Sequence, residues 1–409
     1  MKRNAALLLA LLMLLNLCSC ADGAIRAEQS GAVQSGETQS GMEQPEVAEP
    51  GSRASVLDGK KIIFVGCSYT YYGGVVIKDD YYIHSQKKRA DDRGYFYQLC
   101  KANGADVSVM DWCYGGHDLT DMFDGHCDAN DNKVEKGHDH AADLIDRYYD
   151  YVVLQEIKVP EPWTAEQYYA NIKGVMDLFR AANPDVKFFY VIHDGVYTGN
   201  YPAGWKKSVK LVEQEGAQIV DWGTLVWDVW NGHVDVPGTD TVYNKSSFIV
   251  SRNSSDGYHP NLLSGYLSAL MTYCAITGET AVGQPNGFYN DTEVNTYFDV
   301  ERFRIGEYWW DDPNTEADER KTNFVEIFES DADMKGLQML ADEYLAKECK
   351  LNAEYTVIFQ EPDGSVISSK AYLYGDKVTA PVKSGETFAG WDKEIVRCAG
   401  KAVYTAVYR

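Results

Sequence analysis

The sequence predicts an α/β fold, a three-layer doubly wound parallel sheet, followed by a small C-terminal β domain. Between residues 60 and 276, short apolar runs alternate with longer helix-like stretches. Several of these runs are almost continuously hydrophobic, as strands are when helices cover both faces of a parallel sheet. From Glu354 onward, alternating strand-like runs and turns replace the helical stretches, which predicts the second domain.

The expected elements of the first domain alternate along the chain. The expected strands are Lys61–Val65, Val107–Trp112, Tyr151–Leu154, Lys187–Ile192 and Gln218–Val220. The expected helices are Tyr95–Asn103, Ala141–Tyr149, Ala165–Ala182, Trp205–Glu215 and Leu262–Ile276. The last of them starts after Pro260, a residue suited to a first helical turn. In doubly wound folds, functional groups gather at the carboxyl ends of the strands, so we expect a site there.

The composition limits what the protein can bind. The 409 residues allow two or three domains at roughly 150 residues each. The 38 Lys and Arg residues stand against 61 Asp and Glu residues, for a formal net charge of -23. This balance excludes a nucleic-acid-binding protein, which needs a basic face to neutralise phosphates, and disfavours docking by charge on anionic lipid. At 13% aromatic residues, the chain is not a disordered acidic polymer.

The N-terminus, residues 1–20, has the pattern of an export signal. Two basic residues precede the apolar stretch Ala5–Leu17, which is too short for a comfortable membrane span. The stretch ends in Leu-Cys-Ser-Cys, which resembles a bacterial lipobox and implies cleavage and lipidation at Cys20. The alternative is a plain signal peptide. Residues 21–57 are rich in Ser, Gly, Gln and Glu and are expected to form a flexible linker. We therefore expect an extracytoplasmic protein, lipid-anchored to the bacterial cell membrane.

The other seven cysteines do not suggest a disulfide framework or a zinc site. Their number is odd, and no two of them form a Cys-x-x-Cys pair. We expect scattered buried thiols.

A serine after the first strand and a histidine before the last helix are candidate catalytic residues. Ser68 follows Gly66 and Cys67 at the strand end, where its Oγ would stand above the sheet edge. Asp256 and His259 lie three residues apart on the loop that enters the last helix. His259 would accept the Ser68 proton through Nε2, and Asp256 would fix the ring tautomer. Taken alone, Ser68 is better explained as a helix cap, and Asp256 and His259 are each explained by a loop with an Asp cap and a surface His.

Together these motifs resemble the SGNH/GDSL hydrolase superfamily, over about Lys60–Gly278. Ile62–Thr70 is similar to the first sequence block of a branch that reads Gly-Asn-Ser-Phe/Tyr-Thr, with Cys67 in place of the Asn. The resemblance implies a flavodoxin-like hydrolase domain, here placed at 58–280. It also implies that Ser68 is the nucleophile of an esterase.

The resemblance further implies an oxyanion hole. One donor would be the backbone N–H of Ser68. A second would be the backbone N–H of Gly116, with Gly115 as the alternative, in the block Trp112–Leu119. The third block normally supplies an Asn amide in Gly-x-Asn-Asp, a motif that this sequence lacks. Gln155 is the only amide at the end of the third strand, and it would donate the same hydrogen bond from one methylene further out.

Other groups of residues give weaker indications of a functional site. Cys67 is a rival nucleophile to Ser68, but only one of two adjacent side chains can face the cleft. The segment Asp124–Glu135 superficially suggests a calcium loop, yet Ala stands where such a loop needs Gly. His138 and His140 suggest a metal pair less strongly than a solvated loop, so no metal is assigned. Aromatic residues that would stack on a sugar or belong to the core are Tyr69–Tyr72, Tyr81, Tyr82, Trp163 and Trp205.

Two regions follow the hydrolase-like domain. Residues 281–350 are acidic, with helix-like stretches at Phe324–Phe328 and Met334–Cys349, and are expected to pack on the core. In residues 351–409 the expected strand segments and the turn between the first two are Tyr355–Phe359, Pro362–Gly364, Val366–Tyr372, Phe388–Asp392 and Ala402–Tyr408. This pattern resembles the Listeria–Bacteroides repeat, a β-grasp-like module. The resemblance implies a spacer, or contact with cell-surface glycan or protein.

These patterns together favour a cell-surface serine esterase that removes O-acyl groups, such as acetyl, from carbohydrate. The substrate class is taken from the resemblance to the hydrolase family. Other small esters belong to the expected substrates as well. No cofactor is implied. The alternative is a non-catalytic glycan-binding or adhesive lipoprotein on a degenerate scaffold. Most of the excess negative charge lies in residues 58–350, so a cleft there is expected to prefer neutral or cationic esters.

Overall fold

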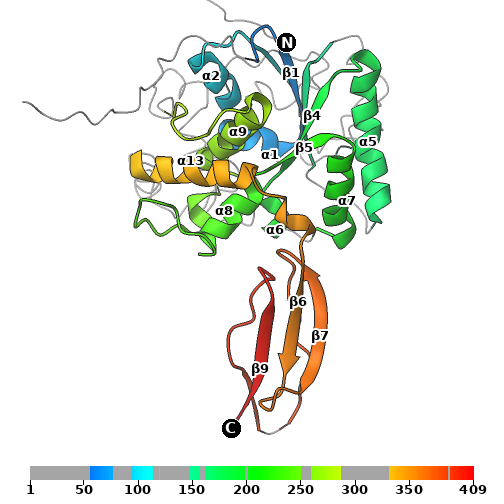
Figure 1. Cartoon of the computed structure of the whole chain (residues 1–409), viewed down its shortest axis with the longest axis vertical. Coiled ribbons are helices and arrows are strands. Elements are labelled where there is room, and N and C mark those ends of the chain that lie inside the picture. Colours follow the sequence, from blue (N-terminus) through cyan, green and yellow to red (C-terminus); the bar gives the residue numbers. More distant parts are fainter. Residues whose placement is uncertain are drawn as a thin grey trace, which may run out of the picture. The chain divides into compact units, whose positions relative to one another are not determined.

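The computed structural model describes residues 56–76, 94–113, 119, 148–156, 163–198, 201–249, 259–286, 331–385 and 387–409 (Figure 1). The expected signal peptide and nearly all of the expected linker lie outside these ranges. In the described part of the chain, no helix combines the length and the apolarity needed to cross a membrane.

The α/β part is built on a five-stranded parallel sheet, which confirms the predicted fold class. The strands are β1 (Lys61–Gly66), β2 (Ser108–Cys113), β3 (Tyr151–Gln155), β4 (Lys187–Ile192) and β5 (Ala217–Asp221). Their order is β2-β1-β3-β4-β5, and each neighbouring pair is parallel. This is the flavodoxin-like order, in which the winding direction reverses between β1 and β3. Ser68 follows the end of β1 by two residues and Gln155 is the last residue of β3, so both lie at the carboxyl ends of these two strands.

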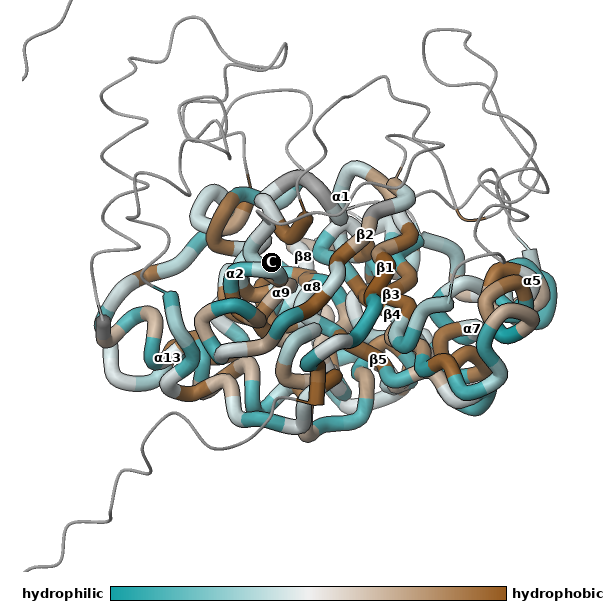
Figure 2. Tube along the Cα trace, turned by 90° about the horizontal axis from the view of Figure 1, so that it is seen from above, coloured by the Kyte–Doolittle hydropathy of each residue, from teal (hydrophilic) through white to brown (hydrophobic). Residues whose placement is uncertain are grey.

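Helices cover both faces of the sheet (Figures 1 and 2). One core packs the sheet against α2 (Tyr95–Ala102), α8 (Trp222–Trp230), α9 (Leu262–Thr277) and α13 (Asp331–Leu345). The other core lies against α5 (Ala165–Ala182) and α7 (Ala203–Gln214). Figure 2 shows the apolar strands between the two sets of helices. Because both faces are buried, the strands read as continuous apolar runs.

The observed elements correct several expectations. Helix α8 was not expected. It follows β5 without a loop because the Asp221 carboxylate caps its first turn by accepting from Thr224 N–H at 2.9 Å. Pro260 is not in the first turn of α9: Asn261 is the N-cap, and Pro260 forms an isolated bridge with Ile249.

Two expected helices differ at their ends. Tyr149 is not helical, and residues 141–147 of that expected helix lie outside the described ranges. Helix α13 starts at Asp331 and ends at Leu345, so it does not reach Cys349, which precedes the 3-10 turn η4 (Lys350–Asn352). The expected helix Phe324–Phe328 is outside the described part. The six described cysteines other than the N-terminal pair are buried free thiols, as predicted: Cys67, Cys100, Cys113, Cys274, Cys349 and Cys398.

The C-terminal segment forms a second, four-stranded mixed sheet. Its strands are β6 (Glu354–Gln360), β7 (Val366–Leu373), β8 (Phe388–Trp391) and β9 (Ala402–Tyr408), in the order β7-β6-β9-β8. A separate small core holds it together, centred on Val357, Phe359 and Tyr404. The hairpin between β6 and β7 turns at Gly364, whose φ of 85° favours glycine.

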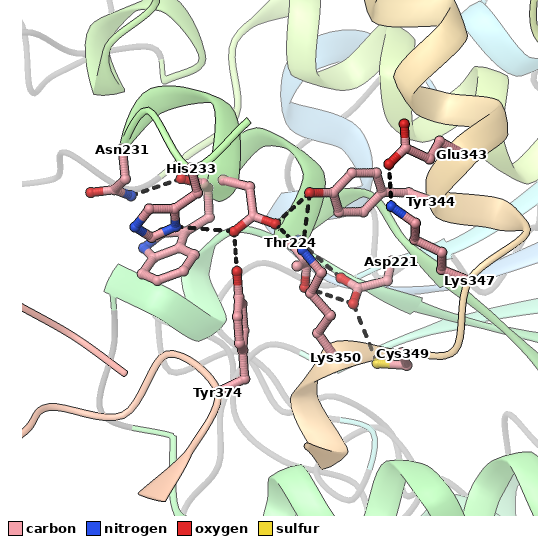
Figure 3. Close-up of polar contacts among 12 residues, drawn as sticks. Asp221, Thr224, Asn231, His233, Glu343, Tyr344, Lys347, Cys349, Lys350 and Tyr374 are labelled. Atoms are coloured by element: carbon pink, nitrogen blue, oxygen red, sulfur yellow. Dashed lines mark hydrogen bonds and ion pairs between the residues drawn. The ribbon is translucent and has the colours of Figure 1, made fainter. Parts of the chain in front are cut away.

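A buried carboxylate joins this second sheet to the α/β part. Asp228, fully buried on α8, accepts hydrogen bonds from the hydroxyls of Tyr344 and Tyr374, and from Lys350 Nζ at 2.5 Å. His233 Nδ1 lies 3.2 Å from the same carboxylate. Figure 3 shows these four partners converging from separate segments of the chain. One anionic group thus links α8, α13, η4 and the end of β7.

Candidate active site

Ser68 and His259 meet at the carboxyl end of β1. Ser68 is the first residue of the short helix α1 (Ser68–Tyr71) and is 5% exposed. Its Oγ lies 2.9 Å from His259 Nε2, across 191 positions of sequence. A histidine ring nitrogen at this distance can take the hydroxyl proton as a general base. The two residues are therefore placed as nucleophile and base require.

Two glycines allow this approach. After α1 the chain passes through the 3-10 turn η1 (Tyr72–Gly74), which packs on the first turn of α9. A Cβ on Gly265 would lie 1.8 Å from the carbonyl oxygen of Gly73, and a Cβ on Gly73 would lie 2.5 Å from the carbonyl oxygen of Asn261. Gly73 also has a φ of 75°. Only glycine permits this backbone contact, which holds the Ser68 segment against the segment after His259.

The N-terminus of α9 is anchored on its other side by polar contacts. Asn261 Oδ1 accepts from Ser264 N–H at 3.1 Å, and Asn261 Nδ2 donates to the carbonyl oxygen of Ser247 at 2.8 Å. Ser264 Oγ donates to the carbonyl oxygen of Phe248 at 2.7 Å. These bonds hold the backbone that immediately follows His259 against residues 247 and 248.

Gln155 ends β3, beside the turn that carries Ser68. It is 4% exposed, and its side-chain oxygen accepts from Thr70 Oγ1 at 2.5 Å. Its amide nitrogen is buried and has no hydrogen-bond partner among the described residues. An unpaired buried donor costs roughly 1–3 kcal/mol, so an oxygen atom bound beside it would restore a lost hydrogen bond.

A neutral histidine, His193, is hydrogen-bonded to the backbone directly after β3. His193 follows β4, and its Nδ1 accepts from Gly195 N–H at 3.0 Å. Its Nε2 therefore carries the proton and donates to the carbonyl oxygen of Glu156 at 2.8 Å. Burial lowers the pKa of His193 to about 3, so the ring stays neutral. Tyr69, next to Ser68, packs against this ring with centroids 3.9 Å apart.

Glu156 links the end of β3 to the segment expected to hold the second oxyanion donor. Its side-chain Oε1 accepts from the backbone N–H of Leu119 at 2.8 Å, and both residues are buried. Leu119 lies three residues after Gly116. Gln155 therefore offers an amide donor at the end of β3, and the next residue, Glu156, holds the backbone of Leu119.

The described geometry does not favour Cys67 as the nucleophile. Its side chain is completely buried, and burial raises the pKa of the thiol well above its ordinary value. A thiol acts as a nucleophile through its thiolate. Ser68, in contrast, has a histidine within hydrogen-bond distance.

The described ranges contain only part of the expected site. They bring Ser68, His259 and Gln155 to the ends of β1 and β3. The remaining expected site residues lie outside the described residues: Asp256, Gly116, its alternative Gly115, and Cys20. The weaker candidates 124–135, His138, His140, Tyr81 and Tyr82 also lie outside them. In the part that is described, no cluster of three or more His, Cys, Asp or Glu side chains suits a metal ion.

Among the aromatic candidates for sugar stacking, two belong to the protein interior. Trp205 is 1% exposed within the core around α5 and α7. Tyr69 is buried, and its ring centroid lies 3.9 Å from that of His193 and 5.2 Å from that of His259. Trp163 is half-buried and packs against Tyr168. Stacking on a ligand is therefore excluded for Trp205 by burial.

Three residues near this site were not singled out from the sequence: Thr70, His193 and Asp194. His193 and Asp194 come directly after the apolar run Lys187–Ile192. The expectation that functional groups gather at strand ends applies to them as it does to Ser68 and Gln155. Thr70 differs, because only its contact with Gln155 reveals its relevance.

Asp194 is expected to make stability depend on pH. It is 1% exposed, and no side chain among the described residues donates a hydrogen bond to its carboxylate. Burial raises its pKa to about 8, although the charge of Lys245 opposes the shift. In the unfolded chain this carboxyl has the ordinary pKa of an Asp, about 3.9, so folding stability falls as pH rises between the two pKa values.

Asp194→Asn, which resembles the protonated form, is expected to be more stable than the wild type. The gain should grow by up to about 1.4 kcal/mol per pH unit between about pH 5 and pH 8. Urea unfolding of both proteins across this range measures it. A gain that is constant with pH would contradict the assigned protonation.

No protein-family model matches the chain, and no curated protein matches its sequence. Among solved structures, a DUF4886 family protein from Bacteroides uniformis matches 70% of this chain and 94% of its own, with 13% identity and a TM-score of 0.36. A carbohydrate esterase family 3 structure from Talaromyces cellulolyticus matches 53% and 96%, with 12% identity and a TM-score of 0.33. A family two carbohydrate esterase from Clostridium thermocellum, in complex with cellohexaose, matches 54% and 64%, with 14% identity and a TM-score of 0.31. At these identities and TM-scores the names describe those proteins and carry no argument about this chain.

Proposed function

We propose that the protein is a serine esterase of the SGNH/GDSL type. The observation that carries this proposal is the 2.9 Å contact between Ser68 Oγ and His259 Nε2 at the carboxyl end of β1. The amide nitrogen of Gln155, at the end of the neighbouring strand, has no partner in the described part of the chain and supports the proposal, because acyl transfer needs hydrogen-bond donors for the negative charge on oxygen.

In the proposed reaction, Ser68 Oγ attacks the ester carbonyl carbon while His259 Nε2 takes the hydroxyl proton. The carbonyl oxygen becomes an oxyanion, held by the backbone N–H groups of Ser68 and Gly116 and by the Gln155 amide. Collapse of this intermediate breaks the ester bond, and His259 returns the proton to the leaving alcohol. Water, activated by His259, then hydrolyses the acyl-serine. Asp256 would orient His259.

The proposed substrates are O-acyl groups, acetyl above all, on carbohydrate outside the cell. The lipobox-like end of the signal motif supports an extracytoplasmic protein anchored through Cys20. Residues 351–409 would then act as a spacer or contact cell-surface glycan or protein. The acidity of the α/β part favours neutral or cationic esters over polyanions, which makes a neutral aryl acetate a suitable first probe.

Covalent labelling tests the proposed function. A fluorophosphonate reagent is expected to phosphonylate Ser68 and to abolish aryl acetate hydrolysis, because it mimics the tetrahedral intermediate. Peptide mass spectrometry locates the adduct. Cys67→Ala, which removes the adjacent buried thiol, should label like the wild type. A protein that neither hydrolyses the ester nor takes the label would instead favour the non-catalytic, glycan-binding alternative.

A further inference from the structure

Thr70 stands two residues after the proposed nucleophile and is 3% exposed. Its Oγ1 accepts from the backbone N–H of Cys67 at 3.3 Å and donates to Gln155 Oε1 at 2.5 Å. The Cys67 N–H can only donate, so the single hydroxyl proton of Thr70 remains available for Gln155. Within the described ranges, no other acceptor bonds to this hydroxyl.

The direction of these bonds orients the Gln155 side chain. A primary amide offers an acceptor on one branch and two donors on the other. If the amide were turned by half a rotation, its nitrogen would face Thr70 Oγ1 and the hydroxyl proton would lose its acceptor. Leaving a buried polar group unpaired is costly. The hydroxyl therefore selects the orientation in which Oε1 faces Thr70 and Nε2 has no partner within the residues that the structure describes.

The packing around Thr70 holds this arrangement in place. A Cβ on Gly66 would lie 2.3 Å from Thr70 Oγ1 and 3.2 Å from Gln155 Cβ. The missing side chain at position 66 thus provides the space in which the hydroxyl meets the amide. His193 also donates a hydrogen bond to the backbone carbonyl of Glu156, the residue after Gln155. The amide is therefore constrained through its own oxygen and through its backbone.

We propose that Thr70 is a positioning residue for the oxyanion hole: its hydroxyl holds the Gln155 side-chain oxygen so that the amide nitrogen donates to the oxyanion. This inference rests on the proposed esterase function. Gln155 stands where the third block of the resembled family has an Asn, and the contact with Thr70 compensates for this difference. The longer Gln side chain has one more rotatable bond, and the hydrogen bond from Thr70 removes that freedom.

Replacing Thr70 tests this role. Thr70→Val keeps the shape but removes the hydroxyl, so the amide can rotate, and kcat for aryl acetate hydrolysis is expected to fall about 10- to 100-fold. KM should change little, because the oxyanion forms only in the transition state. Thr70→Ser restores the hydroxyl and should retain most of the activity. Thr272→Val is the matched control, since that buried hydroxyl donates to Ser268 O within α9, and its kcat should be unchanged.

A double variant separates positioning from general damage. Gln155→Ala is expected to lower kcat on the order of 100-fold, and adding Thr70→Val should lower it little further, because both changes act through one amide. If Thr70→Val does not fold, Thr70→Ala removes the same hydroxyl and carries the same expectation. A folded variant of either kind with wild-type kcat would overturn the role of Thr70. Absence of Ser68-dependent hydrolysis in the wild type would instead overturn the esterase function.

Discussion

Replacing Ser68 by alanine is expected to lower kcat for aryl acetate hydrolysis by about 10⁴- to 10⁶-fold, the scale seen when the nucleophile of a serine hydrolase is removed. Without Oγ, no acyl-serine can form, and His259 Nε2 loses the hydroxyl that lies 2.9 Å away. Steady-state rates of the purified full-length protein, with the uncatalysed rate subtracted, measure the effect. Binding of a neutral ester should persist, because the change removes one buried oxygen atom.

Ser208→Ala is the matched control for this substitution. Ser208 is equally buried, but its hydroxyl donates to the Trp205 carbonyl oxygen in α7, at 2.7 Å. Its removal should leave kcat near the wild-type value. Equal activity of the wild type and Ser68→Ala would rule out Ser68 as the nucleophile. A different residue would then have to account for the hydrolysis.

Replacing Asp228 by alanine is expected to cause the largest loss of stability, about 3–5 kcal/mol. Burial by itself raises the pKa of Asp228, but hydrogen bonds from His233, Lys350, Tyr344 and Tyr374 outweigh it and hold the pKa below its ordinary value. Without the carboxylate, a lysine and two buried hydroxyls lose their shared acceptor. Denaturant unfolding followed by tryptophan fluorescence measures the loss.

An exposed acid provides the control for Asp228. Asp177 pairs with Lys173 and Arg180 on the surface of α5, and Asp177→Ala should cost no more than about 1 kcal/mol. The effect of Asp228 also has a defined pH dependence. Because its folded pKa is depressed, its contribution is present above about pH 4, the pKa of an unfolded Asp, and is lost as pH falls through the folded pKa. A loss no larger than that of Asp177→Ala would show that the cluster does not stabilise the fold.

Much of the fold could be predicted because its physical causes are local. Strand Lys187–Ile192 matches the expected range, and the other four strands of the α/β sheet lie within two residues of theirs. Two-sided burial leaves a continuous apolar run, which can be recognised without knowing the neighbours. Helix α8 was not predicted, because no local signal separates it from the strand before it. It begins directly after β5, without the turn residues that normally separate two elements, and Asp221 serves as both strand end and cap.

The candidate site, too, could be predicted from the sequence only in part. The order of Ser68 and His259 along the chain, and their places at a strand end and before a helix, are properties of the sequence. Whether Ser68 Oγ and His259 Nε2 come within 2.9 Å depends on the glycine contact between η1 and α9, which joins segments far apart in the chain. The sequence also pointed to Gln155 as an amide at a strand end, but it could not say which of its two polar branches would be free.

The sequence by itself thus determined the α/β class and the strand segments, and it pointed to the candidate reactive groups, because these follow from hydrophobic periodicity and side-chain chemistry. Only the tertiary structure decided the orientation of the Gln155 amide, the burial of Asp194 and the sharing of Asp228 among four partners. These properties arise from contacts between segments distant in the chain. Such contacts are set by how the helices pack on the sheet, for which no short stretch of sequence carries a signal.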